Sequence, residues 1–403
     1  MFHKFKQLAL ENQKMLYIAL DIPMFLVSFG FIFLTGNLLS AENISLLNGA
    51  LGVFTILFTI GNALQTVVAR RIASAEKLIG IRDFLKASAQ ISLFLSVPFL
   101  IFTTYFQTLI SIESVGKTSF IILVLLHVFI GLFRGVLQGT ERFLSLWSAL
   151  ALDHVFRIIV ILIYMTEELS LSGAWNAVLI ASLVHLIFAA FSMPSQFWEN
   201  LREKSSETLL GKEIIMVAFT NLFLNFLLSI DIIIAGEHLN TAGGSYVTAN
   251  KFGRILYFIG TSIGIVILPT FSRIITTHTL KTRIILGTFI LIPLSAVLAP
   301  TAALLLQPLI EFSFPSDVVP SFTILSWTFF ANFALASIHL FITWHIAQQT
   351  QYLNQLLGVC CIILSFLLWY GPPTELFLIQ TISYSVWILT ITLAFLAYVQ
   401  KKS

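Results

Sequence analysis

The sequence has few charged residues and almost no cysteine. Only 10% of its 403 residues are Asp, Glu, Lys or Arg, whereas 58% are hydrophobic. A soluble globular protein needs a more polar surface, so this balance excludes a soluble fold and indicates a polytopic membrane protein. The two cysteines, Cys360 and Cys361, are adjacent within an apolar run. Their spacing excludes a disulfide framework and a Cys-x-x-Cys metal or redox motif.

Catalytic motifs are missing as well. The chain has no serine nucleophile elbow, no glycine-rich phosphate loop, no HExxH motif and no pair of carboxylates at a usable spacing. The connections between its apolar runs are too short to house a catalytic domain. We therefore predict that the protein is not an enzyme and uses neither a cofactor nor a catalytic metal. The net charge of +3 is dispersed over short connections, a pattern that does not favour nucleic-acid binding.

The sequence does have long apolar runs. A transmembrane helix needs about 20 mainly apolar residues. Twelve segments meet this requirement, at residues 15–38, 44–69, 87–110, 118–137, 144–165, 171–193, 214–236, 244–268, 284–306, 319–344, 353–370 and 376–399. The fold expected is therefore an all-α polytopic membrane protein with about 12 transmembrane helices.

The basic residues indicate how these segments are oriented. Most Lys and Arg residues fall in alternate connections and at the two termini. Because cytoplasmic loops carry an excess of Lys and Arg, both termini are expected in the cytoplasm and the number of crossings is even. We predict a multi-pass protein of the plasma (inner) membrane.

The chain also repeats itself. Three residues recur 202 positions later: Asn48, Thr59 and Arg71 match Asn250, Thr261 and Arg273. Similar offsets across several helices predict two six-helix bundles, at 1–194 and 214–403, joined by a cytoplasmic linker at 195–213. Six crossings per bundle make the repeat parallel, with the two bundles expected to enclose a cleft.

Charge occurs where lipid does not favour it, in the eighth segment. Arg254 lies roughly 15 Å from a helix start near residue 244, about the middle of a bilayer core. Asn250, Arg254, Tyr257 and Thr261 follow one another at spacings of 4, 3 and 4, which places them on one helix face. A charged side chain at this depth is expected to face a polar interior or a watery cavity.

Lys251 lies three residues before Arg254, so both cations can reach the same cavity. They are candidates for binding an anionic group, together with Asn250 and Tyr257. The alternative for Lys251 is a structural ion pair with Asp231, because both lie at a similar depth in one helical hairpin.

The equivalent helix of the first half carries a polar stripe without charge, consisting of Asn48, Gly52, Thr55, Thr59, Asn62 and Thr66. A neutral polar wall is therefore expected opposite a positive one, with Asn62 as its candidate binding residue.

Three stretches resemble a known family. They are the run 231–236 (DIIIAG), which is followed by 244–250 (GSYVTAN) and 268–273 (LPTFSR), the connection 134–143 (RGVLQGTERF), and residues 313–325 before the tenth segment. These stretches resemble the Wzx-type oligosaccharide flippases of the multidrug, oligosaccharidyl-lipid and polysaccharide exporter (MOP) superfamily. The resemblance implies a MATE-like arrangement of the twelve helices.

The resemblance implies a transporter that flips a polyprenyl-diphosphate-linked oligosaccharide from the cytoplasmic to the outer leaflet by alternating access. On this hypothesis Arg254 and Lys251, together with Arg157, hold the diphosphate and sugars while the lipid tail stays in the bilayer. The expected partners are this lipid-linked oligosaccharide, membrane lipids and enzymes of surface polysaccharide assembly.

Three acids within the segments are candidates for coupling transport to an H⁺ or Na⁺ gradient: Asp21, Asp153 and Asp231. Each has a structural alternative. Asp153 and Arg157 are four residues apart and can neutralise each other. Asp21, two residues before Pro23, is either a titratable acid beside a helix kink or a satisfied structural acid.

Two other functions stay open at this point. A multidrug or small-solute antiporter of the same superfamily would share the helix layout, but it would favour an acidic cavity for cationic drugs. A membrane polysaccharide polymerase or ligase would need a sizeable outer loop with catalytic groups, and the outer loops expected here are only a few residues long.

Overall fold

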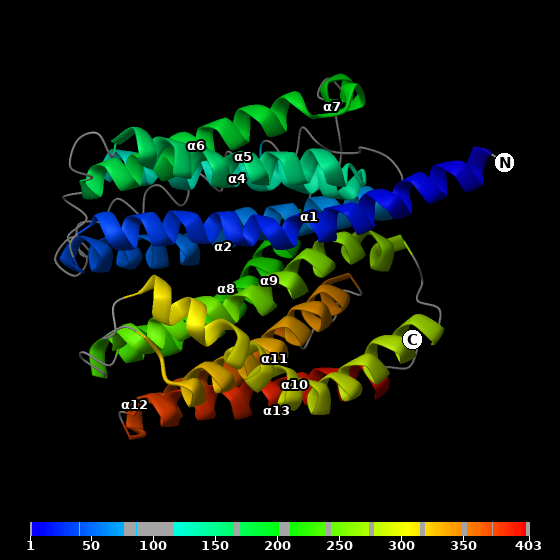
Figure 1. Ribbon diagram of the computed structural model, residues 1–403. Helices are drawn as coiled ribbons and strands as arrows, with labels where there is room; N and C mark the ends of the chain where they lie inside the picture. The colour runs from blue at the N-terminus through cyan, green and yellow to red at the C-terminus, as the bar shows by residue number, and fades with distance from the viewer. Residues whose placement is uncertain are drawn as a thin grey trace. The chain divides into compact units, whose positions relative to one another are not determined.

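The computed structural model describes residues 2–39, 41–75, 86, 117–164, 170–200, 210–238, 243–273, 278–314, 319–347, 353–372 and 374–399. All regular secondary structure in these ranges is helical. The helices are α1 (Phe2–Leu38), α2 (Ala41–Ala75), α4 (Lys117–Gly139), α5 (Phe143–Tyr164), α6 (Leu171–Phe191), α7 (Ser195–Asn200), α8 (Leu210–His238), α9 (Gly243–Arg273), α10 (His278–Ser313), α11 (Phe322–Ala347), α12 (Leu353–Tyr370) and α13 (Glu375–Val399) (Figure 1). The predicted segment 87–110 lies outside the described residues.

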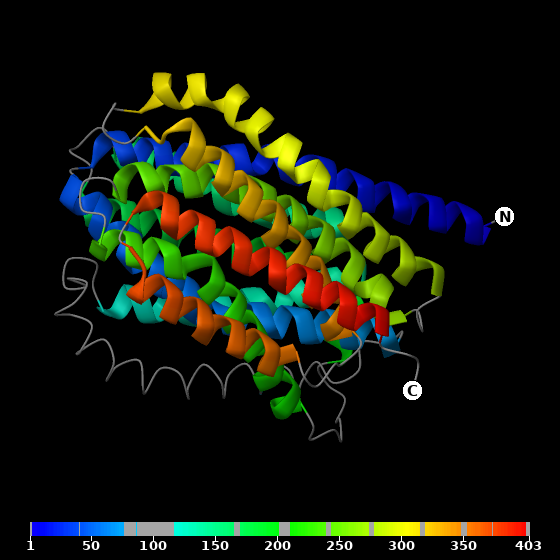
Figure 2. The same ribbon diagram turned by 90° about the horizontal axis from the view of Figure 1, so that it is seen from below.

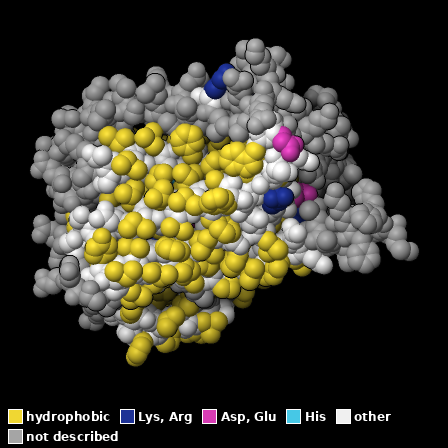
Figure 3. Space-filling view, turned by 90° about the horizontal axis from the view of Figure 1, so that it is seen from above, with side chains coloured by type: hydrophobic (Ala, Val, Ile, Leu, Met, Phe, Trp, Pro, Cys, Tyr) yellow, Lys and Arg dark blue, Asp and Glu magenta, His cyan; other side chains and the backbone are white. Residues whose placement is uncertain are grey.

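The chain is a multi-pass membrane protein. Within the described ranges, nine helices are long and apolar enough to cross a bilayer: α4, α5, α6 and α8 to α13. Many of their large apolar side chains are exposed, among them Ile163 on α5, Phe191 on α6 and Ile362 on α12. Figure 3 shows one face of the molecule, on which hydrophobic side chains form a broad surface with charged groups only near its edge. Such a surface is stable when lipid covers it.

The chain divides into two compact units, Met1–Asn221 and Leu222–Ser403. The first unit includes α7, which lies within the predicted linker 195–213, and also the beginning of α8. Glu213 near the start of α8 pairs with Arg70 and accepts a hydrogen bond of 3.0 Å from Arg71 Nε near the end of α2. This double ion pair fixes the start of α8 to the N-terminal unit. In each unit the long helices run side by side (Figures 1 and 2).

The same helix pairs recur in both units, as the sequence repeat predicts. In the first unit α2 packs on α4, and α4 packs on α6. In the second unit α9 packs on α11, and α11 packs on α13. When the segment 87–110 is counted as the third span, both sets join the second span of a unit to the fourth and the fourth to the sixth. The packing therefore confirms the repeated architecture.

Glycines allow the second and fourth helices of each repeat to come into close contact. A Cβ atom added at Gly131 of α4 would lie 2.1 Å from the backbone oxygen of Gly61 on α2. In the second repeat, a Cβ added at Gly260 of α9 would lie 2.8 Å from the Cα of Ala336 on α11. In a membrane, where lipid tails remove most of the hydrophobic drive between helices, such close backbone packing is a main source of helix association.

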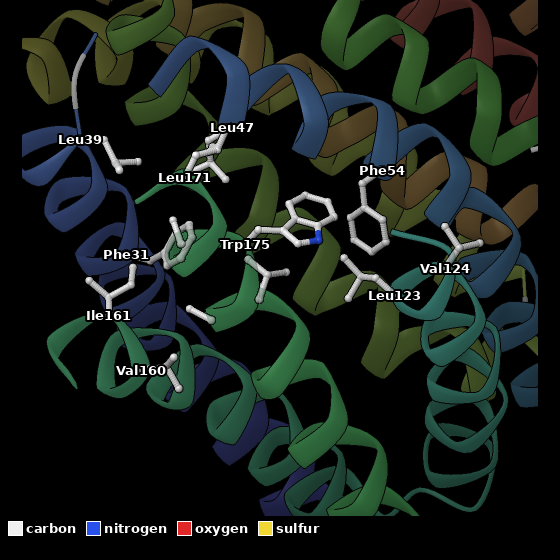
Figure 4. Close-up of a cluster of buried hydrophobic side chains, with 13 residues drawn as sticks. Phe31, Leu39, Leu47, Phe54, Leu123, Val124, Val160, Ile161, Leu171 and Trp175 are labelled. Atoms are coloured by element: carbon white, nitrogen blue, oxygen red, sulfur yellow. The ribbon is translucent and has the colours of Figure 1, made fainter. Parts of the chain in front are cut away.

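The apolar core of the N-terminal unit gathers around Trp175 of α6 (Figure 4). The Trp175 side chain is fully buried, and its ring lies edge-on to Phe54 of α2 with the centroids 6.5 Å apart. Phe31 from α1, Leu123 from α4 and Ile161 from α5 belong to the same cluster. Side chains from five helices thus contribute to one apolar cluster.

The close packing of α2 on α4 yields a prediction. Gly131→Ala forces two backbones apart, and we expect it to destabilise the protein by about 1 to 3 kcal/mol. Gly30→Ala is the matched control, because its added methyl would meet only the flexible end of Ile158, at 3.0 Å. Melting temperatures in detergent test this: a Gly131→Ala protein as stable as Gly30→Ala would contradict the proposed role of the contact.

Candidate functional site

The most connected polar network of the C-terminal unit joins α8 to α9. Asp231 lies seven residues before the end of α8 at His238, and Asn250 lies seven residues after the start of α9 at Gly243. Residues equally far from the turn of a helical hairpin lie at the same depth, so the two side chains meet. Asn250 Nδ2 donates a hydrogen bond of 2.5 Å to Asp231 Oδ2, and Tyr246 Oη donates one of 3.0 Å to the same oxygen.

Arg254 completes the network one turn further along α9. Its Nε donates a hydrogen bond of 2.9 Å to Asn250 Oδ1, and its Nη2 donates one of 2.5 Å to the backbone oxygen of Leu228. Asp231 and Asn250 are only 2% and 6% exposed, and Arg254 is half-buried. A guanidinium at this depth is tolerated because its donors meet oxygen acceptors instead of hydrocarbon.

Lys251 is in a different situation. It is half-buried on α9, and its ammonium forms no hydrogen bond or ion pair with the described residues. Asp231, the partner considered from the sequence, is also described, and no ion pair joins the two. The carboxylate of Asp231 instead accepts hydrogen bonds from Tyr246 and Asn250. Lys251 thus contributes a positive charge that the described part of the protein does not neutralise by contact.

A small cavity lies beside this network. Asp231, Asn250 and Arg254 line it from α8 and α9, and Asn332 lines it from α11. Its volume of about 10 Å³ is room for roughly one water molecule. The side-chain oxygen of Asn332 is buried without a hydrogen-bond partner among the described residues. A polar side chain from a third helix therefore lines the same cavity as Arg254.

The rest of the predicted stripe on α9 faces α11. Tyr257 Oη lies 3.5 Å from His339 Nδ1, with the two ring centroids 5.7 Å apart. Thr261 bonds to the backbone oxygen of its own helix at Tyr257, at 3.1 Å. The stripe is thus one continuous face, but Asn250 and Arg254 belong to the network with α8 and Tyr257 to a contact with α11.

In the N-terminal unit, Asp153 and Arg157 form the ion pair that their spacing allows, with Arg157 Nη2 at 2.5 Å from Asp153 Oδ2. Asp153 is buried, and its charge also interacts with three histidines, His127, His154 and His185. Arg157 thus has its ion-pair partner within the N-terminal unit, whereas Arg254 lies in the C-terminal unit.

Arg134 of α4 is the residue that the sequence analysis missed. It interacts electrostatically with Tyr17 and Asp21 of α1 and with Asp153 of α5, and so brings two predicted acids into one cluster. The sequence analysis assigns the motif 134–143 to a connection, whereas α4 continues to Gly139. The position of Arg134 inside the predicted transmembrane segment 118–137 was the sequence feature that could have identified it as a candidate site residue.

Several polar atoms of this cluster are buried without a hydrogen-bond partner among the described residues. They include Tyr17 Oη, Arg134 Nε, Asp153 Oδ1 and His185 Nε2. Buried polar groups are normally satisfied by protein or by ordered water, so these atoms are expected to bond to ordered water. Within the described ranges, no three His, Cys, Asp or Glu side chains are grouped to hold a metal ion.

The predicted neutral wall is described only in part. Asn62 is half-buried on α2, and its backbone oxygen accepts a hydrogen bond of 2.8 Å from Thr66 Oγ1. Thr59 is buried on the same helix. The side chains of Asn48 and Thr55 and the surroundings of Gly52 lie outside the described set.

Comparison with solved structures establishes the fold. An aspartate-to-asparagine mutant of the MATE transporter VcmN from Vibrio cholerae superimposes with a TM-score of 0.71 at 13% identity, over 97% of this chain and 95% of that chain. The chain has the MATE fold. An outward-facing multidrug resistance MATE family transporter of the MOP superfamily gives a TM-score of 0.71 at 16% identity, over 96% of this chain and 95% of that one.

The MATE transporter ClbM in complex with Rb⁺ also matches, with a TM-score of 0.61 at 16% identity over 98% of this chain and 94% of that chain. No family model and no curated protein sequence matches the chain. The MATE fold agrees with the arrangement expected from the sequence. At these identities it carries no information on the substrate.

The ion pair on α5 yields a prediction. Arg157→Met leaves the carboxylate of Asp153 buried without its counter-charge and should cost about 3 kcal/mol of stability. Adding Asp153→Asn removes the isolated charge and should restore most of the melting temperature in detergent. If the double variant is no more stable than Arg157→Met, the two residues do not act as a pair.

Proposed function

We propose that the protein flips a polyprenyl-diphosphate-linked oligosaccharide across the membrane by alternating access, for surface polysaccharide assembly. The observation that carries this proposal is the excess of positive charge on α9. In the cluster of Asp231, Asn250, Lys251 and Arg254, two cations accompany a single carboxylate. A cluster with this balance favours an anionic substrate over a cationic drug.

The chemistry of the two cations suits a diphosphate. A guanidinium offers a planar fork of donors to phosphate oxygens, and an ammonium acts as a compact point charge. Arg254 uses Nε and Nη2 within the protein, and its Nη1 forms no hydrogen bond with the described residues. Nη1 of Arg254 and the ammonium of Lys251 therefore remain as donors for phosphate oxygens. Asn250 and Tyr257 flank them on the same helix face.

The N-terminal unit has a different role in this proposal. Its cluster balances Asp21 and Asp153 against Arg134 and Arg157, so it has little net attraction for an anion. Asp21 and Asp153, and Asp231 in the other unit, are the proposed sites for coupling to H⁺ or Na⁺. Binding of the ion would have to differ between inward-facing and outward-facing states to drive transport. Arg157 would serve this cluster, and Asn62 would supply neutral polar contacts to sugars.

The proposed location is the plasma (inner) membrane, with both termini in the cytoplasm. This orientation would let the protein take a lipid-linked oligosaccharide from cytoplasmic enzymes and deliver it to the assembly enzymes on the other side. The basic residues of the alternate connections support it.

The proposal predicts that Arg254→Ala abolishes export. In a strain that lacks the chromosomal gene, this variant should leave lipid-linked oligosaccharide stranded on the inner leaflet, as lipid extraction and leaflet-selective labelling would show. Arg254→Lys keeps the positive charge but lacks the planar set of guanidinium donors, and this variant should retain partial export. Arg142→Ala is the matched control, because it also removes a guanidinium bonded to a backbone oxygen, that of Ser192, but outside the apolar segments.

Full export by Arg254→Ala, at a normal protein level in the membrane, would remove Arg254 from the mechanism. Normal surface polysaccharide in the deletion strain, with no accumulated lipid-linked intermediate, would refute the flippase function itself.

A second function is as compatible with the MATE fold as the first. One neighbour is a multidrug resistance transporter, so export of small solutes or drugs by this chain has the same support from the fold. Expression in an efflux-deficient host distinguishes the two functions. Increased resistance to cationic drugs that depends on Asp153 or Asp231, and not on Arg254, would favour the multidrug function.

A further inference from the structure

Asn250 occupies the centre of the network between α8 and α9. Its Oδ1 accepts from Arg254 Nε at 2.9 Å and its Nδ2 donates to Asp231 Oδ2 at 2.5 Å. We propose that Asn250 is a positioning residue that keeps Asp231 from pairing directly with Arg254, and so leaves the guanidinium available to an anionic headgroup. This inference rests on the proposed function for the identity of the headgroup, and on the geometry alone for the separation of the two charges.

An amide is the side chain that fits this position. It carries an acceptor and a donor, and both are used in opposite directions. A carboxylate at this position would have no donor for Asp231 and would be repelled by its like charge. It would also form a charge-assisted ion pair with the guanidinium of Arg254. An alanine would leave both neighbours without their bond and would let them approach each other.

The acceptors around Arg254 are neutral. Asn250 Oδ1 accepts a hydrogen bond from Arg254 Nε, and the backbone oxygen of Leu228 accepts one from Nη2. One edge of the guanidinium is therefore held in place by neutral acceptors, which do not neutralise its charge. A direct carboxylate pair would instead use two donors and neutralise the group. The held edge fixes the orientation of the plane, and Nη1 at its other end stays free of bonds to the described residues.

Two neutral donors bond to Asp231. Tyr246 Oη and Asn250 Nδ2 both donate to its Oδ2 and stabilise the buried carboxylate, and Arg254 forms no ion pair with it. The negative charge of Asp231 therefore lowers the positive potential at Arg254, but Asp231 forms no ion pair with the guanidinium. Such a cation, oriented but not paired, is what reversible capture of an anion requires.

The titratable and charged groups around the network of Asn250 come from four helices. Asp231 is on α8, His339 is on α11, and α9 itself carries Tyr246, Lys251, Arg254 and Tyr257. The helix α13 adds Ile379 and Ile382 to the cavity wall, both apolar, and Glu375 at the far end beside Tyr246 and Ser245. A carboxyl introduced at position 250 would thus find Asp231 and Arg254 as its immediate charged neighbours.

The first experiment measures the availability of Arg254 without any substrate. The protein in nanodiscs is treated with phenylglyoxal at about pH 8, and modification of Arg254 is followed by mass spectrometry. Asn250→Asp should slow this modification about tenfold or more, because the introduced carboxylate pairs with the guanidinium. Asn221→Asp, the same chemical change earlier on α8, is the control and should leave the rate unchanged.

The second experiment measures anion binding. Farnesyl diphosphate is titrated into the same nanodiscs at about pH 7.5. Asn250→Asp should weaken binding about tenfold or more relative to the wild type, because the introduced carboxylate pairs with the guanidinium. Asn221→Asp is again the control and should leave binding unchanged.

The outcomes separate this inference from the proposed function. An unchanged phenylglyoxal rate in Asn250→Asp overturns the positioning role, whatever the substrate. Farnesyl diphosphate binding by Asn250→Asp that is as tight as binding by the wild type also overturns it. If instead the rate falls as expected while wild-type protein binds no farnesyl diphosphate and Arg254→Ala exports normally, the positioning role stands and the diphosphate flippase function fails.

Discussion

The hydrogen bonds of one guanidinium determine what the C-terminal unit can do. A charge inside an apolar helix is costly unless its donors are satisfied, and Arg254 meets this condition with an amide oxygen and a backbone carbonyl instead of a carboxylate. This choice keeps the positive charge in place. With a contacting acid the same arginine would be a structural ion pair, as Arg157 is with Asp153 in the N-terminal unit. The charge of Arg157 is thus neutralised by a contacting carboxylate, whereas the charge of Arg254 is not.

Much of the fold could be predicted from the sequence, because the bilayer imposes strong rules on it. Apolar runs of about 20 residues locate the helices, and the recurrence of Asn48, Thr59 and Arg71 indicates the repeat. Which helices touch was harder to predict. The contact of Gly131 with Gly61 depends on small residues that carry no hydropathy signal, and Gly131, Gly135 and Gly139 show their spacing of four only when helix packing is considered.

The candidate site could be predicted as a set of residues but not as a set of bonds. Depth along the hairpin placed Lys251, the neighbour of Asn250, level with Asp231, and periodicity placed Asn250 and Arg254 on the same helix face. Depth could not decide whether Lys251 or Asn250 reaches the carboxylate, because that depends on the rotation of α9 about its own axis. Arg134 was missed for another reason: a basic residue near a helix end was interpreted as a topology signal although its helix continues past it.

The central claim is that the polar face of α9 borders water and not lipid. Thiol accessibility tests it most directly, in a background with Cys360 and Cys361 replaced by serine. A membrane-impermeant thiol reagent should label Lys251→Cys and Thr261→Cys, and should not label Ile362→Cys, which replaces a side chain 72% exposed on the apolar surface of α12. If only a lipid-soluble maleimide reaches Lys251→Cys and Thr261→Cys, as at position 362, that face contacts acyl chains and the account is contradicted.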